Sequence, residues 1–198
     1  VRRSLHESLD RLGLDRVDVL YLHDPDDHEE QALTTAIPAM IELREEGLVR
    51  AVGAGMNQTA MLTRFVEETD IDLVLCAGRY TLLEQGALAD LLPAALAHDV
   101  GVVIGGVFNS GLLARPRPPE GALYNYSEAP APLLERARAV ADVCEQHGVA
   151  LPDAALAFVR AHPAVVSTVV GARGADQVSA FLEAARTPVP VELWAELR

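Results

Sequence analysis

Apolar residues follow two patterns that alternate along the chain. Short continuous apolar runs, typical of buried strands, occupy residues 17–22, 50–55, 71–76, 100–105 and 165–170. Other stretches repeat their apolar residues at helical spacing, namely residues 2–12, 29–46, 57–68, 85–98, 133–147, 152–161 and 175–185. Strands that alternate with helices in this way predict an α/β fold with about five parallel strands in one sheet.

Local signals predict where several of these elements begin and end. Asn57 is placed to cap the start of its helix, and Pro152 stands at the first position of another, where a missing N–H is tolerated. Residues 115–132 are rich in proline and polar side chains and predict a long loop. The whole pattern fits either a doubly wound sheet or part of a (β/α)8 barrel, and both folds bind ligands at the carboxyl ends of their strands.

The charge and the cysteines limit the partners and the location. The chain has 16 basic and 29 acidic residues, a net charge of −13, which argues against nucleic-acid binding and against an anionic membrane surface. No apolar run is long enough to span a membrane, and we see no secretory leader. Two distant cysteines, Cys76 and Cys144, fit a reducing cytoplasm. All 16 basic residues are arginine, so this chain alone completes no mechanism that needs a lysine.

The turn after the first strand holds the densest group of reactive side chains. It reads His-Asp-Pro-Asp-Asp-His over residues 23–28. One interpretation is a histidine that polarises a carbonyl or relays a proton. A second is a metal site, since imidazole and carboxylate bind zinc and related ions. A third is a solvated acidic turn without function, and the spacing alone leaves all three open.

Glycine-rich turns follow the later strands. Gly171, Arg173 and Gly174 lie between the last strand and a helix, an arrangement that suits a phosphate but also an ordinary turn. Gly105 and Gly106 allow a ligand or a neighbouring helix to approach closely. Tyr80 after the third strand suits either stacking on a substrate or packing at the edge of the core.

Four segments together resemble one family. Residues 11–23, Arg-Leu-Gly-Leu-Asp-Arg-Val-Asp-Val-Leu-Tyr-Leu-His, are similar to the aldo/keto reductase signature, in which a helix leads into the strand that ends at the catalytic histidine. Residues 23–28, 77–85 and 105–113 resemble the branch that contains L-fucose dehydrogenase, also called D-threo-aldose 1-dehydrogenase. The resemblance implies a (β/α)8 TIM barrel, of which residues 1–198 form the C-terminal portion of a single domain, an incomplete barrel of about five strands.

The resemblance also implies roles for particular residues. The family catalyses with an Asp, a Tyr, a Lys and a His, and of these only His23 has a match here, so we expect the chain alone to be inactive. Tyr80 is then a substrate-binding candidate. The matches to the family's cofactor site are Asn57 for the carboxamide, Ser110, Gly111 and Leu112 for the pyrophosphate, and Gly171, Arg173 and Gln177 for the adenosine side. Met56 stands where the family has a serine, and Gly105 where other branches have a stacking aromatic residue.

The activity that the resemblance implies is NAD(P)-dependent oxidation of an aldose at C1 to its lactone. We expect NAD rather than NADP, because the segment after the last strand offers one basic side chain, Arg173. The expected partner is a small sugar, and the oligomeric state stays open. Two alternatives remain: a non-catalytic truncated barrel, and a metal-dependent hydrolase built on His23, Asp24, Asp26, Asp27 and His28.

Overall fold

The chain forms two compact units. The computed structural model describes residues 1–125 and 127–197. The first unit comprises Val1–Arg79 with Gly86–Val103, and the second comprises Tyr80–Gln85 with the chain from Ile104 onward.

Five strands form one parallel sheet in the order β1-β2-β3-β4-β7. They are β1 (Val17–His23), β2 (Val49–Met56), β3 (Leu73–Ala77), β4 (Gly101–Gly105) and β7 (Val165–Thr168). Their order in the sheet is their order in the chain, as in a barrel, whereas a doubly wound sheet reverses its order at a switch point. Among the described residues β1 and β7 are the outer strands, so the barrel is not closed. The predicted α/β class, the five strands and the incomplete barrel are confirmed.

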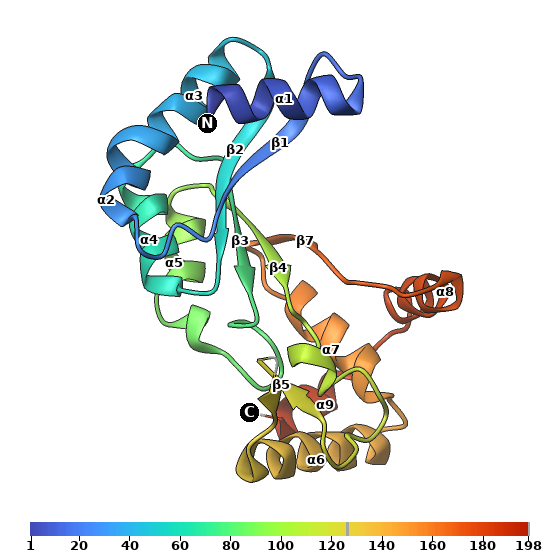
Figure 1. Cartoon of the computed structure of the whole chain (residues 1–198). Coiled ribbons are helices and arrows are strands. Elements are labelled where there is room, and N and C mark those ends of the chain that lie inside the picture. Colours follow the sequence, from blue (N-terminus) through green and yellow to red (C-terminus); the bar gives the residue numbers. More distant parts are fainter. Residues whose placement is uncertain (126, 198) are drawn as a thin grey trace. The chain divides into compact units, whose positions relative to one another are not determined.

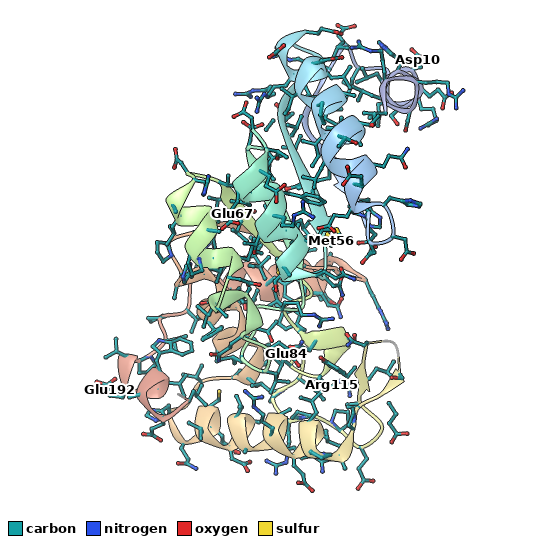
Figure 2. The ribbon with its side chains drawn as sticks, turned by 90° about the vertical axis from the view of Figure 1, so that its left-hand side faces the viewer. Asp10, Met56, Glu67, Glu84, Arg115 and Glu192 are labelled. Atoms are coloured by element: carbon teal, nitrogen blue, oxygen red, sulfur yellow. The ribbon has the colours of Figure 1, made fainter. Side chains whose placement is uncertain are left out.

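Helices of the first unit cover one face of β1–β3 (Figure 1). They are α1 (Arg2–Leu12), α2 (Glu29–Gln31), the π-helix η1 (Ala32–Ala36), α3 (Ile37–Glu45), α4 (Thr59–Glu68), the 3₁₀-helix η2 (Gly86–Leu88) and α5 (Leu91–Ala97). Helices α3 and α4 both contact β2. The strand residues on that face are fully buried: Val52, Ala54, Met56, Val74 and Cys76. Figure 2 shows Met56 inside this layer, with Asp10 and Glu67 on outer helix surfaces.

The second unit consists mainly of helices. The elements are the 3₁₀-helix η3 (Asn109–Gly111), the short strands β5 (Leu123–Tyr124) and β6 (Ser127–Glu128), and the helices α6 (Ala131–Gln146), α7 (Leu151–Arg160), α8 (Ala175–Ala184) and α9 (Val191–Glu196). Helix α7 contacts β7, α6 and α8, and α6 also contacts α9. No helix in the described part of the chain is long and apolar enough to cross a membrane.

Three predicted helices differ from the structure for local reasons. The helix expected over 29–46 passes through a π-turn before α3, where Pro38 cannot donate the backbone hydrogen bond of a regular helix. The helix expected over 85–98 is interrupted because the Asp90 carboxylate accepts a hydrogen bond from Leu91 N–H at 2.6 Å and starts a new helix. Asn57 does not cap its helix, which begins at Thr59 after Gln58.

The predicted loop and the C-terminal end contain elements that the pattern missed. Within residues 115–132, β5 and β6 pair as an antiparallel hairpin, with Leu123 opposite Glu128. Asn125 turns it at a φ of 46°, a left-handed conformation that asparagine tolerates. Helix α9 buries Leu193 completely.

Candidate active site

His23 is the last residue of β1, at the carboxyl end of the sheet. Its partner across the β1–β2 ladder is Gly55, and Tyr21 pairs with Gly53. Because strand side chains alternate, these residues lie on the sheet face opposite the buried, helix-covered Ala54. Gly53 has to be glycine, since a Cβ there would lie 2.0 Å from the carbonyl oxygen of Leu73. In a barrel this face is the interior one.

The His23 side chain is open to solvent, with 85% of it exposed. Its Nδ1 lies 3.7 Å from Oδ2 of Asp24, a contact that becomes an ion pair when the imidazole is protonated. His23, Asp24 and His28 line a shallow pocket of about 370 Å³ with residues of η1 and α3. Among residues 1–125 and 127–197, no three His, Cys, Asp or Glu side chains are grouped closely enough to hold a metal ion. The five candidate ligands His23, Asp24, Asp26, Asp27 and His28 are thus not gathered into one such group in the described part of the chain.

Asn57 follows β2 directly. Its side chain is exposed, and the preceding Met56 is buried under the helices of the first unit. His23 and Asn57 thus lie at the carboxyl ends of two paired strands of the first unit.

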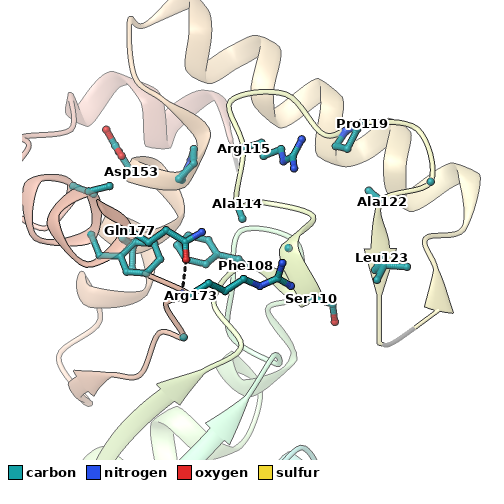
Figure 3. A pocket seen from close by; sticks show the side chains of 18 residues that line it. Phe108, Ser110, Ala114, Arg115, Pro119, Ala122, Leu123, Asp153, Arg173 and Gln177 are labelled. Atoms are coloured by element: carbon teal, nitrogen blue, oxygen red, sulfur yellow. Dashed lines mark hydrogen bonds between the residues drawn. The ribbon is translucent and has the colours of Figure 1, made fainter. Parts of the chain in front are cut away.

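The second unit contains a pocket of about 680 Å³ that gathers most of the predicted cofactor residues (Figure 3). Ser110 and Gly111 come from η3, and Gly171, Arg173 and Gln177 come from the turn after β7 and from α8. About sixty positions separate the two groups in the sequence. Leu112, also predicted, is completely buried beside the pocket loop and does not line the pocket.

The backbone of this pocket leaves room for a ligand. Ser110 has a φ of 59° and Gly111 a φ of 102°, so the η3 turn is left-handed at both residues. A Cβ added at Gly111 or Gly171 would meet no atom within 4 Å, which means that the space beside both residues is open. At the next turn, Gln177 Oε1 accepts a hydrogen bond from Arg173 N–H at 2.7 Å and fixes the start of α8.

Four residues that line the pocket were not predicted from the sequence. Arg115 adds a second guanidinium group, and Asp153 adds a carboxylate from the first turn of α7. Phe108 and Phe181 line the pocket as a stacked pair with ring centroids 5.6 Å apart. The signals were present but weak: Phe108 and Arg115 flank the predicted pyrophosphate loop, and Asp153 follows the helix-starting Pro152.

Tyr80 lies in the core of the second unit. It is 4% exposed, its ring centroid is 5.1 Å from that of Phe158, and His162 packs edge-on at 5.7 Å. Burial raises the pKa of the phenol. This environment favours the packing interpretation of Tyr80 over contact with a substrate.

Comparisons with known proteins decide the family. The sequence profile described as "Aldo/keto reductase family" matches residues 1–198. The chain belongs to the aldo/keto reductase family. It is 46% identical over 198 residues to D-threo-aldose 1-dehydrogenase of Pseudomonas sp and 38% identical over 208 residues to pyridoxal 4-dehydrogenase of Microbacterium luteolum. All of the chain aligns with each relative, and it spans 60% of each relative's length.

A solved aldo/keto reductase has the same fold. The holo form of AKR11C1 from Bacillus halodurans superposes with a TM-score of 0.82 at 25% identity, over 98% of this chain and 64% of that chain. Enzymes of this family are oxidoreductases that use a nicotinamide dinucleotide. The second-unit pocket fits part of such a cofactor: its volume lies in the range of small-molecule sites, its guanidinium groups match phosphates, and its phenylalanine pair offers a flat apolar wall.

Proposed function

We propose that this chain is the C-terminal portion of the single barrel domain of an NAD(P)-dependent aldose 1-dehydrogenase. It acts on a sugar of the L-fucose or D-threo-aldose type and forms the lactone. The observation that carries the proposal is the pocket in which Ser110 and Gly111 line the same cavity as Arg173 and Gln177. The substrate class rests on the 46% identity to D-threo-aldose 1-dehydrogenase.

The residues of this chain have distinct roles in the proposal. A bound nicotinamide supplies hydride chemistry. His23 orients the sugar oxygen by a hydrogen bond, and Asn57 binds the carboxamide of the cofactor. Arg173 pairs with phosphate, while the open space beside Gly111 and Gly171 lets the ligand approach the backbone. The proton-transferring tyrosine and its lysine are supplied from outside these 198 residues, so we propose that the isolated chain does not turn over sugar.

NAD is the proposed preferred cofactor, and NADP is the alternative. Ser110 and Gly111 precede Arg115 by only a few residues, so Arg115 serves the pyrophosphate that both cofactors share. Among the described residues that line the pocket, that leaves Arg173 as the cation for the additional ribose phosphate of NADP. The expected cytoplasmic location and the sugar as partner stay predictions from the sequence.

The test is steady-state turnover by the full-length protein that contains this chain, with L-fucose and NAD, followed by the absorbance of reduced nicotinamide. We expect His23→Ala to lower kcat at least tenfold while dinucleotide affinity stays within about twofold. His28→Ala is the matched control, because His28 is an exposed histidine of the same turn. Turnover of pyridoxal but of no aldose would overturn the substrate class. Absence of turnover with every carbonyl and alcohol substrate tested would overturn the assignment of the protein as a dehydrogenase.

A further inference from the structure

The second-unit pocket has two chemically different sides. Arg173 and Ser110 form a cationic and polar side. The other side comes from α7 and α8, which contact each other, and its lining is mostly apolar: Pro152, Leu156, Ala180 and Ala184. In Figure 3, Asp153 lies across the pocket from Ser110, and Arg173 extends toward Ser110. The stacked rings of Phe108 and Phe181 line the same pocket.

Asp153 is the one carboxylate that lines this pocket among the described residues. Its side chain makes no hydrogen bond or ion pair within residues 1–125 and 127–197, although Arg115 and Arg173 line the same cavity. Partial burial raises the pKa of this carboxyl group. Gln177 Oε1, a nearby acceptor, is already engaged by Arg173 N–H. Asp153 therefore presents an unused acceptor on an otherwise apolar side of the pocket.

We propose that Asp153 reads the purine base of the dinucleotide by accepting a hydrogen bond from the exocyclic amino group of adenine. This inference rests on the proposed function. The flat base stacks against the phenylalanine pair, which leaves its amino edge to find a polar partner. A 6-oxo purine carries a carbonyl oxygen in place of this amino group, so a carboxylate that faces that position loses its donor and is repelled. Asp153 thereby selects adenine dinucleotides over hypoxanthine dinucleotides.

Asp153 also has a structural role that the test has to separate. It occupies the first turn of α7, where a carboxylate interacts favourably with the helix dipole. Loss of that interaction lowers stability but does not change which base binds. Asp176 is a matched control, since it occupies the first turn of α8 and does not line the pocket.

The experiment measures dissociation constants of the full-length protein for NADH and for reduced nicotinamide hypoxanthine dinucleotide, by fluorescence titration. We expect the wild type to bind NADH about tenfold more tightly or better, because a charge-assisted hydrogen bond is lost with hypoxanthine. Asp153→Asn should reduce the ratio to about twofold or reverse it, since its amide can donate to the 6-oxo group. Asp176→Asn should keep the wild-type ratio.

The possible results separate the role of Asp153 from the proposed function. Equal wild-type affinity for both dinucleotides overturns the role of Asp153 and leaves the proposed function standing; this comparison needs no variant. An unchanged preference in a folded Asp153→Asn protein overturns it as well. If the wild type binds neither dinucleotide, the proposed function fails, and the inference fails with it.

Discussion

The hydroxyl of Tyr124 donates a hydrogen bond of 2.8 Å to Oε1 of Glu84. Tyr124 belongs to β5 in the segment after β4, and Glu84 belongs to the segment after β3. Strand β5 also contacts η3, which carries Ser110 and Gly111, and its Leu123 lines the pocket. The hydrogen bond therefore connects one wall of the second-unit pocket to the segment after β3. Thr81 is fully buried, and its hydroxyl oxygen accepts a hydrogen bond of 3.0 Å from Glu84 N–H. This second hydrogen bond fixes the backbone position of Glu84.

Removing the hydrogen bond between Tyr124 and Glu84 should make this wall of the pocket more mobile. We expect Tyr124→Phe to weaken dinucleotide binding about three- to tenfold and to speed proteolysis within residues 115–132, because a hydrogen bond to a carboxylate is lost while the ring stays. Limited proteolysis and fluorescence titration measure the two effects. Glu84→Gln keeps an acceptor oxygen and should have a smaller effect than Glu84→Ala. Equal proteolysis of wild type and Tyr124→Phe contradicts this role of the hydrogen bond.

Arg44 should contribute to the stability of the first unit. Its guanidinium is 20% exposed, donates to Asp72 Oδ2 at 2.7 Å and also pairs with Asp70. The same Asp72 oxygen accepts from Val52 N–H of β2 at 2.8 Å. Arg44→Ala removes the guanidinium from both carboxylates, while Asp72 keeps the Val52 N–H and Asp70 is largely exposed. We expect the variant to lower the free energy of unfolding by about 1 kcal/mol.

Urea denaturation measures the effect of Arg44→Ala. The control is Arg50→Ala, because the Arg50–Asp18 pair is 70% and 79% exposed and contributes little. Equal denaturation midpoints for the two variants would contradict the account of Arg44.

His162 should make stability depend on pH. Its Nδ1 accepts a hydrogen bond from Ala164 N–H at 3.2 Å, and burial lowers the pKa of the imidazole below 6.5. Well above pH 6.5 the imidazole is neutral in both the folded and the unfolded state, so His162 contributes no pH dependence to stability there. As the pH falls through 6.5, the unfolded chain takes up a proton that the folded state resists, and stability decreases.

The measurement compares urea midpoints at about pH 7.5 and about pH 5.5 for wild type and His162→Asn. The wild type should lose more stability than the variant over this interval, and the difference isolates His162 from the other titrating groups. An equal or smaller loss in the wild type contradicts the lowered pKa.

The two pocket arginines should affect the two cofactors differently. Arg115→Ala should weaken NAD and NADP binding by similar factors, about tenfold, because both carry the pyrophosphate. Arg173→Ala should weaken NADP at least several-fold more than NAD. Dissociation constants for both cofactors measure this. Arg117→Ala serves as the control, since Arg117 pairs with Asp142 and does not line the pocket. A selective loss of NADP in Arg115→Ala would reverse the assignment.

The sequence best predicts those structural elements that depend on residues close together along the chain. The five strands are correct to within about two residues, because short continuous apolar runs are typical of the strands of a parallel sheet. The position of His23 at a strand end follows from that pattern. The break before α3 was missed, although Pro38 is visible in the sequence, because the apolar spacing continues through it.

What the sequence does not predict depends on distant contacts. The hairpin of β5 and β6 is tethered by residues forty positions apart, Tyr124 and Glu84. Arg115 and Asp153 enter the pocket only because the loop after β4 and the start of α7 fold toward α8. No local pattern of apolar and polar residues encodes such long-range contacts. The resemblance therefore named Ser110 and Arg173 but not the residues that face them in the pocket.

Isotope transfer tests the central claim most directly. The full-length protein is incubated with NAD and L-fucose that carries deuterium at C1, and the reduced cofactor and the sugar product are analysed by mass spectrometry and NMR. If the protein is an aldose 1-dehydrogenase, the C1 deuteride moves to C4 of the nicotinamide, the hydroxyl proton is released and the sugar is recovered as the lactone. Reduced cofactor without deuterium, or a product that keeps deuterium at C1, would contradict the account.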